Sequence, residues 1–206
     1  MARPAEYDAS TMGLAQEIAD PYLRPSFSLG NRLLRLLWAI VHVLLYRTSP
    51  VPLHAWRSFL LRCFGASMGP ACHFYPSSRV WAPWNLYCQD QVTAANGVEI
   101  YNPAPMRFGS HVILSQGAYL CGATHDYDRA DFPLLAYEMR FGAYAWICAR
   151  AAVAPGVQVA EGAVLGLGAV ATRSLHAWTV YGGNPAVALK SRIRTQVGDP
   201  PPTEPE

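Results

Sequence analysis

Charged residues are scarce in this sequence, at 15% of 206 residues, whereas apolar residues make up 51%. A composition this apolar is typical of a globular domain and excludes an intrinsically disordered chain. The formal net charge is only +2, so the overall charge gives no reason to expect nucleic-acid binding. The length suits one domain with a substantial core and a smaller appendage.

Acidic residues are absent between Asp20 and Asp90, and lysine occurs only once, as Lys190. A segment that combines arginines and tryptophans with no acidic residue favours contact with an anionic membrane surface. The arginines of this acid-free stretch are Arg24, Arg32, Arg35, Arg47, Arg57, Arg62 and Arg79.

Cysteines are few, odd in number, and show no Cys-x-x-Cys spacing. This pattern argues against a disulfide framework and predicts buried free thiols in a reducing cytoplasm. The sequence also opens without the basic, apolar and small-residue segments of a secretory signal. We therefore expect a cytoplasmic protein, attached at most to the inner face of the cytoplasmic membrane. The cysteines are Cys63, Cys72, Cys88, Cys121 and Cys148.

The strongest pattern present is a repeat of six residues. A period of six fits neither an α-helix nor a simple strand, but it does fit a short strand and a turn stacked on copies of themselves. No single repeat can bury its inward residue alone, so the repeats must share one core. The large apolar residue recurs at Met68, Phe74 and Val80, at Cys88, Ala94 and Ile100, at Phe108, Leu114 and Leu120, and at Phe141, Ile147, Val153, Val159 and Leu165.

The repeat predicts an all-β fold, a parallel β-helix of about five coils. The coils would occupy residues 67–183, and the pattern breaks at 126–140, where we expect a protruding loop. Asn184 and Pro185 then resemble the start of a short C-terminal α-helix, at about residues 185–196. The rest of the terminal segment 184–206 is proline-rich and expected to be disordered.

Two helices are predicted before the coils. Residues 29–46 are apolar around nearly the whole helical circumference, a proline-containing break follows, and residues 53–64 form the second helix. They make up an appendage, 26–66, behind an N-terminal extension, 1–25. Residues 28–64 therefore either pack at a subunit interface or make peripheral contact with a membrane, and the two are compatible. The uninterrupted apolar stretch, 36–46, is too short to span a bilayer.

His125 is the leading candidate for chemistry. It ends the repeat LCGATH where the ladder breaks, and a side chain at such a break can leave the core and meet a ligand. Imidazole suits the removal of a proton from a hydroxyl near neutral pH. A zinc enzyme would need three converging imidazoles. Only His111 and His125 lie in the central repeats, so we expect no metal.

The repeats also resemble a known family. Residues 146–190 are similar to the C-terminal half of the left-handed β-helix, hexapeptide-repeat acyltransferases. Residues 84–135 resemble the colanic acid biosynthesis acetyltransferases within that family, which are related to galactoside and maltose O-acetyltransferases. The resemblance implies a left-handed coil and a homotrimer with active sites between neighbouring subunits. It also implies acetyl-CoA as co-substrate and a sugar hydroxyl of a saccharide or lipid-linked saccharide as acceptor.

The resemblance assigns roles to individual residues. His125 would be the general base, and the backbone N–H of Ala149 would stabilise the thioester oxyanion. Asn102 would line the acceptor pocket, although an Asn-Pro turn residue is an equal alternative. Asp126 and Asp128 would orient the imidazole or bind sugar, or else face solvent. Arg150 stands where the wider family often has glycine. The residues matching the coenzyme A site are Ala149, Leu167, Thr172, Arg173 and Lys190.

Three functions stay open at this point. The first is O-acetylation of a sugar hydroxyl. The second is N-acetylation of an amino sugar, which would use the same base and co-substrate. The third is a non-catalytic trimeric scaffold, which would have no use for His125, Thr172, Arg173 and Lys190 together.

Overall fold

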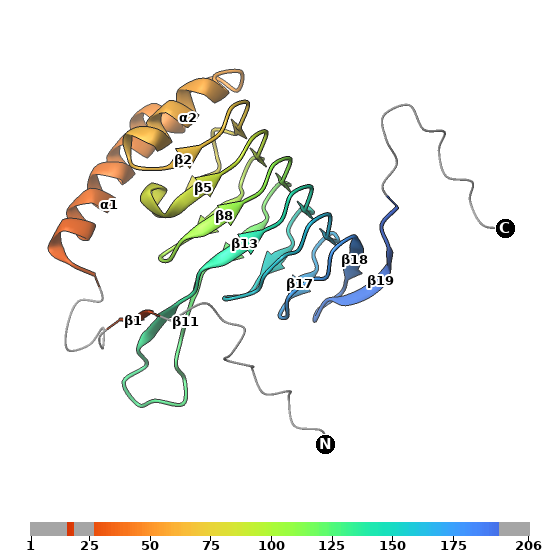
Figure 1. Ribbon diagram of the computed structural model, residues 1–206. Helices are drawn as coiled ribbons and strands as arrows, with labels where there is room; N and C mark the ends of the chain where they lie inside the picture. The colour runs from red at the N-terminus through yellow and green to blue at the C-terminus, as the bar shows by residue number, and fades with distance from the viewer. Residues whose placement is uncertain (1–15, 19–26, 194–206) are drawn as a thin grey trace.

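The computed structural model describes residues 16–18 and 27–193. Its main body is a three-sided, left-handed β-helix whose flat faces are parallel sheets (Figure 1). The first face contains β2 (Ser67–Met68), β5 (Leu86–Cys88), β8 (Met106–Phe108) and β13 (Met139–Phe141). The second face contains β3 (His73–Phe74), β6 (Thr93–Ala94), β9 (Ile113–Leu114), β14 (Trp146–Ile147), β16 (Val164–Leu165) and β18 (Thr179–Gly182). The third face contains β4 (Arg79–Val80), β7 (Glu99–Tyr101), β10 (Tyr119–Cys121), β15 (Ala152–Val153) and β17 (Val170–Ala171).

The coil count slightly exceeds the expected five. The third face has five strands, and the second face stacks six parallel strands before β19. On the first face, β-bridges from Phe141 to Val159 and from Val159 to Leu175 continue the stack beyond β13. The helix therefore has five complete coils and a sixth with two of its three sides.

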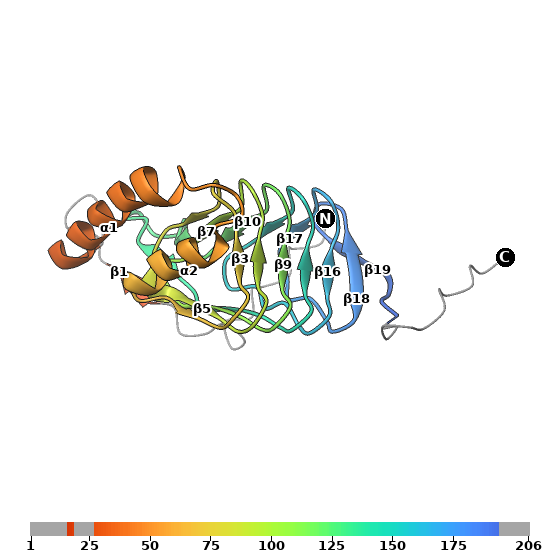
Figure 2. The same cartoon turned by 90° about the horizontal axis from the view of Figure 1, so that it is seen from above.

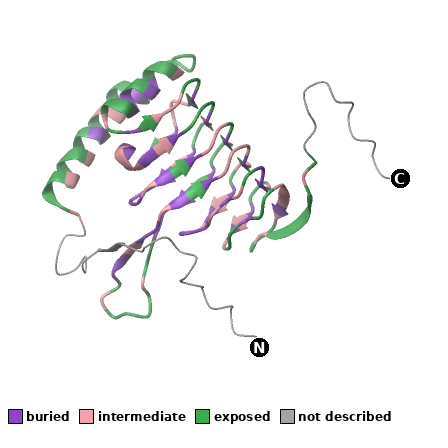
Figure 3. Ribbon diagram, in the orientation of Figure 1, coloured by how far each residue is buried: buried purple, intermediate pink, exposed green. Residues whose placement is uncertain are grey.

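The six-residue ladder is confirmed in register. Leu114 pairs with Ala94 on one side and with Ile147 on the other. The Phe108 and Phe141 rings stack at 4.8 Å between centroids. Apart from the half-buried Met68, the ladder residues are buried (Figure 3). One continuous core therefore runs the length of the prism, as stacked repeats require.

The two N-terminal helices are also confirmed. They lie at the end of the prism where the first coil begins (Figures 1 and 2). The first is α1 (Leu29–Val41), which continues without a break into a π-helical turn, η2 (His42–Tyr46), and the second is α2 (His54–Cys63). A short 3₁₀ turn, η3 (Pro83–Asn85), lies between the first two coils. Leu29–Tyr46 is, by length and composition, apolar enough to cross a membrane, although the uninterrupted apolar stretch 36–46 covers only part of that helix.

One side of α1–η2 is fixed to the first coil by hydrogen bonds. Trp38 Nε1 donates to the Val80 carbonyl at 2.7 Å, and His42 Nε2 lies 3.1 Å from the Ser78 carbonyl. The Tyr46 hydroxyl lies 2.7 Å from Ser78 Oγ. Burial lowers the pKa of His42, which favours the neutral imidazole in this contact. The helix therefore has one orientation relative to the prism.

Arg57 fixes α2 and the preceding loop. Its side chain is fully buried, and its guanidinium donates to Ser49 Oγ and the Pro50 carbonyl, both at 2.8 Å. It also donates to the carbonyls of Val51 and Phe74. One cation thus satisfies backbone oxygens from the interhelical loop and from β3, and joins the two.

The predicted C-terminal α-helix is wrong. Residues Val187–Ser191 form β19, which pairs antiparallel with β18, and Asn184 and Pro185 lie in the turn between them. The physical reason is the last coil: without β19 the outer edge of β18 would expose unpaired N–H and C=O groups. Folding the chain back satisfies that edge. The proposed helix end and the tail beyond residue 193 lie outside the described residues.

Candidate active site

The break in the ladder is a β-hairpin that projects from the third coil (Figure 1). It consists of β11 (Ala123–His125) and β12 (Leu134–Ala136), and β1 (Gln16–Ile18) pairs with the other edge of β12. The hydrogen bond from Tyr137 N to the Gly122 carbonyl, 2.9 Å, closes its base. The hairpin therefore starts earlier than the loop expected at 126–140. The end of the predicted loop, Met139 and Arg140, already belongs to β13 in the next coil.

His125 is exposed at the end of β11, and its ring orientation is fixed. Its Nδ1 lies 2.6 Å from the Phe132 carbonyl on the opposite side of the hairpin. A carbonyl oxygen can only accept, so Nδ1 carries a proton and donates. In the neutral ring the lone pair is then on Nε2. The hairpin therefore presents a proton acceptor of defined position to solvent.

The acidic residues of the hairpin loop bond locally. Asp126 Oδ1 accepts from the Asp128 backbone N–H at 3.2 Å. Arg129 and Asp131 form an ion pair at 2.7 Å, and this arginine lowers the pKa of the exposed Asp131 carboxyl. Asp126 thus stabilises a turn, and the group that orients the imidazole is the Phe132 carbonyl.

Asn102 is completely buried, with its side-chain amide paired to one residue of the coil below. Its Oδ1 accepts from Ala82 N at 2.9 Å, and its Nδ2 donates to the Ala82 carbonyl at 2.8 Å. These contacts favour the turn-residue alternative over a position facing the acceptor.

Replacing Asn102 by alanine would leave the Ala82 N–H buried without its acceptor, and the Ala82 carbonyl would keep only the Asn85 N–H as donor. We expect the free energy of unfolding to fall by about 1–3 kcal/mol, measured by urea denaturation, with the rate per folded molecule retained. The exposed Asn96→Ala change is the control and should alter stability by less than about 0.5 kcal/mol. A loss of rate without a loss of stability would instead assign Asn102 to the acceptor pocket.

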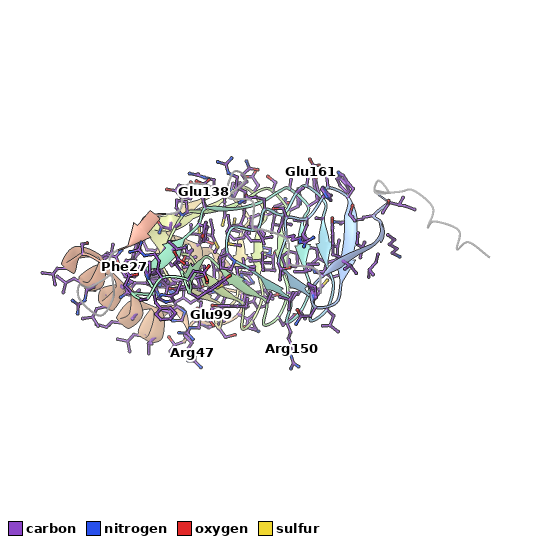
Figure 4. The ribbon with its side chains drawn as sticks, turned by 90° about the horizontal axis from the view of Figure 1, so that it is seen from below. Phe27, Arg47, Glu99, Glu138, Arg150 and Glu161 are labelled. Atoms are coloured by element: carbon purple, nitrogen blue, oxygen red, sulfur yellow. The ribbon has the colours of Figure 1, made fainter. Side chains whose placement is uncertain are left out.

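Ala149 and Leu167 come together at one corner of the prism. The Ala149 carbonyl accepts from Gly168 N at 3.0 Å, which places the two turns directly above one another. Among the described residues the Ala149 N–H has no acceptor, which suits an oxyanion donor. Arg150 has a φ of 57°, a left-handed conformation that glycine adopts more readily than other residues. Figure 4 shows its side chain pointing away from the prism.

The remaining predicted coenzyme residues lie elsewhere. Thr172 and Arg173 follow β17, on the corner after the third face, and Lys190 is on β19, opposite Val180. His125 also projects beyond the third face, from a lower coil. Within one chain, therefore, the base, the candidate oxyanion donor and the basic residues do not form a single pocket.

Two cavities of the described chain are lined by none of these predicted residues. One, of about 310 Å³, lies between α1 and the third face and includes Arg35, Trp81 and Glu99. At its margin the Arg35 guanidinium lies over the Trp81 ring at 4.5 Å, and Trp81 also packs on Phe27. The other, of about 410 Å³, lies on the first face between Tyr87 and the strands β8 and β13. Residues 16–18 and 27–193 contain no group of three or more side chains suited to a metal.

Comparisons with known proteins agree with the fold. The chain is 33% identical over 181 residues to the protein named "Putative colanic acid biosynthesis acetyltransferase WcaF" of Escherichia coli, covering 88% of this chain and all of the relative. A galactoside acetyltransferase solved with coenzyme A aligns with a TM-score of 0.73 at 17% identity, over 80% of this chain and 84% of that one. A maltose O-acetyltransferase of Clostridium difficile aligns with a TM-score of 0.71 at 18% identity, over 81% and 90%. No protein-family model matches the chain.

The triangular coil and these relatives identify the protein as a hexapeptide-repeat acyltransferase, an enzyme class. Within it, the chain belongs to the family of the colanic acid biosynthesis acetyltransferases.

The sequence did not predict one contact of the candidate base, that between His125 Nδ1 and the Phe132 carbonyl. Phe132 has a φ of 43°, an uncommon conformation for a large residue. A contact across a hairpin depends on its register, and residues 126–133 carry no alternating pattern from which that register could be read.

Proposed function

We propose that the protein is an acetyl-CoA-dependent O-acetyltransferase that acts on a sugar hydroxyl of a saccharide or lipid-linked saccharide in the cytoplasm. The observation that carries the proposal is the Nδ1 contact of His125 with the Phe132 carbonyl. This contact leaves Nε2 as the proton acceptor that hydroxyl acetylation requires. The relatives named for acetylating maltose or galactosides support a sugar acceptor.

Proton transfer proceeds through His125 in both directions. Nε2 takes the proton of the acceptor hydroxyl as its oxygen attacks the carbonyl carbon of the thioester. The Ala149 N–H stabilises the oxyanion that forms. When the carbon–sulfur bond breaks, the imidazolium returns its proton to the coenzyme A thiolate. The products are the acetyl ester and free coenzyme A, and no acyl-enzyme forms.

A neighbouring subunit completes the site. His125 and Ala149 lie beyond different corners of one prism, so a second prism must bring a base to an oxyanion donor. A homotrimer gives every base such a neighbour. Thr172, Arg173 and Lys190 then bind the pantetheine arm and the phosphates of coenzyme A, for which basic side chains are suited.

The test is thiol release from acetyl-CoA with a panel of neutral saccharides and amino sugars. We expect acceptor-dependent release, with the product ester cleaved by hydroxylamine at alkaline pH. A hydroxylamine-stable amide formed only with amino sugars would replace O-acetylation by N-acetylation. Absence of both turnover and coenzyme A binding would leave the scaffold as the function.

A further inference from the structure

The outer side of the two helices is apolar and uncovered. Along α1 and η2, eight large apolar residues are 45–73% exposed. The surface continues over the interhelical loop and α2, because Trp56 Nε1 donates to the Leu45 carbonyl at 3.1 Å and Trp56 stacks on Phe59. We call this surface the apolar face. It consists of Leu29, Leu33, Leu36, Leu37, Ile40, Val43, Leu44, Leu45, Val51, Leu53, Trp56 and Phe59. Contiguous apolar surface of this kind marks an interaction site.

Among residues 16–18 and 27–193, no segment covers the apolar face. The last described strand, β19, lies at the opposite end of the prism (Figure 1), and residues 194–206 contain Val197 as their one large apolar side chain. Residues 1–15 and 19–26 contain few large apolar residues, among prolines and acids. Neither segment has enough apolar side chains to bury twelve others.

The charge around the apolar face selects an anionic partner. Arg32, Arg47 and Arg62 are exposed on the same two helices, and no acidic residue occurs between Asp20 and Asp90. Figure 4 shows Arg47 pointing away from the prism. Pairing this face with that of a second copy would bring arginines together with no carboxylate between them. An anionic lipid surface instead offers hydrocarbon to the leucines and phosphates to the arginines.

The fixed side of α1 decides between crossing the membrane and lying on it. Trp38, His42 and Tyr46 bond to the first coil. A spanning helix would break these bonds and move Arg32 and Arg35 into hydrocarbon, which is costly. A helix lying in the interface keeps the bonds and immerses only its outer side.

We propose that α1, η2 and α2 attach the protein to anionic phospholipid membranes, with α1 lying in the plane of the interface. The attachment is independent of catalysis. Both helices lie at one end of the prism, so parallel copies in an assembly present the apolar face in the same direction.

Flotation with phospholipid vesicles tests the proposal. The full chain should float with vesicles that contain phosphatidylglycerol, at low salt, and a carbonate wash should release it. The double variant Leu33→Gln/Leu37→Gln should lower the partition coefficient by about tenfold or more for each leucine. The matched control is Val187→Gln/Leu189→Gln, which changes two equally exposed apolar residues of β19 and should float like the parent.

The charges are tested separately with Arg32→Gln/Arg47→Gln. Each arginine contributes about fivefold on an anionic surface, so this variant should bind about 25-fold more weakly to phosphatidylglycerol vesicles. It should match the parent on phosphatidylcholine alone. Circular dichroism checks that every variant is folded.

Three results would overturn the proposal. The parent could fail to float with anionic vesicles, or the leucine variant could float as well as the parent. Retention after carbonate would show a spanning helix. If the parent stays unbound and the leucine variant alone changes oligomeric state in light scattering, the apolar face contacts a second copy. Flotation needs no turnover, so a failure to float leaves the proposed acetyl transfer untouched. In the same way, an inactive protein that floats leaves the membrane proposal untouched.

Discussion

Replacing His125 by alanine is expected to lower the rate of acetyl transfer by roughly 10²–10⁴ while coenzyme A binding is retained. The imidazole is the group that takes the acceptor proton, and its removal leaves the weakly nucleophilic hydroxyl without a base. The measurement is thiol release at saturating acetyl-CoA and acceptor, together with coenzyme A binding by calorimetry.

A second substitution separates catalysis from the structure of the hairpin. In His125→Asn the amide nitrogen can reach the Phe132 carbonyl as Nδ1 does, but no proton acceptor replaces Nε2. The His125→Asn variant should be as inactive as the His125→Ala variant, and its hairpin should keep the parent structure. His176→Ala removes an exposed histidine from a turn of another coil and should keep full activity. If His125→Ala stays within a fewfold of the parent, His125 is not the base.

Replacing Arg57 by methionine is expected to lower the free energy of unfolding by about 3 kcal/mol or more. Methionine fills part of the volume but donates no hydrogen bond. The carbonyls of Pro50, Val51 and Phe74 would then each lose a charged donor, although the Pro50 carbonyl keeps the Leu53 N–H and the Phe74 carbonyl keeps its contact with His54 Nδ1. Urea denaturation measures the loss, and proteolysis within the interhelical loop should become faster.

The matched control is Arg47→Met, which makes the same substitution at an exposed arginine just after η2. It should alter stability by less than about 0.5 kcal/mol. A loss below about 1 kcal/mol for Arg57→Met would mean that water replaces the guanidinium, which water can do only if the site opens.

The coil could be predicted because its rule is local and repeated. Each inward position, such as Leu114 or Ile147, faces the same environment as the one above it, so the same residue types recur every six positions. The strand β19 could not be predicted, because it forms in response to the open edge of β18. That edge depends on where the stack ends, and no residue near Asn184 and Pro185 encodes it.

The candidate site could be predicted in part. His125 stood out because it ends the ladder, and the structure places it on an exposed hairpin. The partner of its ring did not stand out, since Phe132 contributes a backbone carbonyl and its side-chain identity carries no signal. Asn102 shows the opposite problem: a polar residue next to proline looked suited to a ligand, but its amide pairs with Ala82.

At the base of the hairpin Tyr137 N donates to the Gly122 carbonyl, and Phe108 still pairs with Phe141 across the insertion. Lengthening or replacing the segment between Gly122 and Tyr137 therefore leaves the spacing between the coils unchanged. The surface that this excursion presents can thus change in sequence while the core of the prism stays as it is.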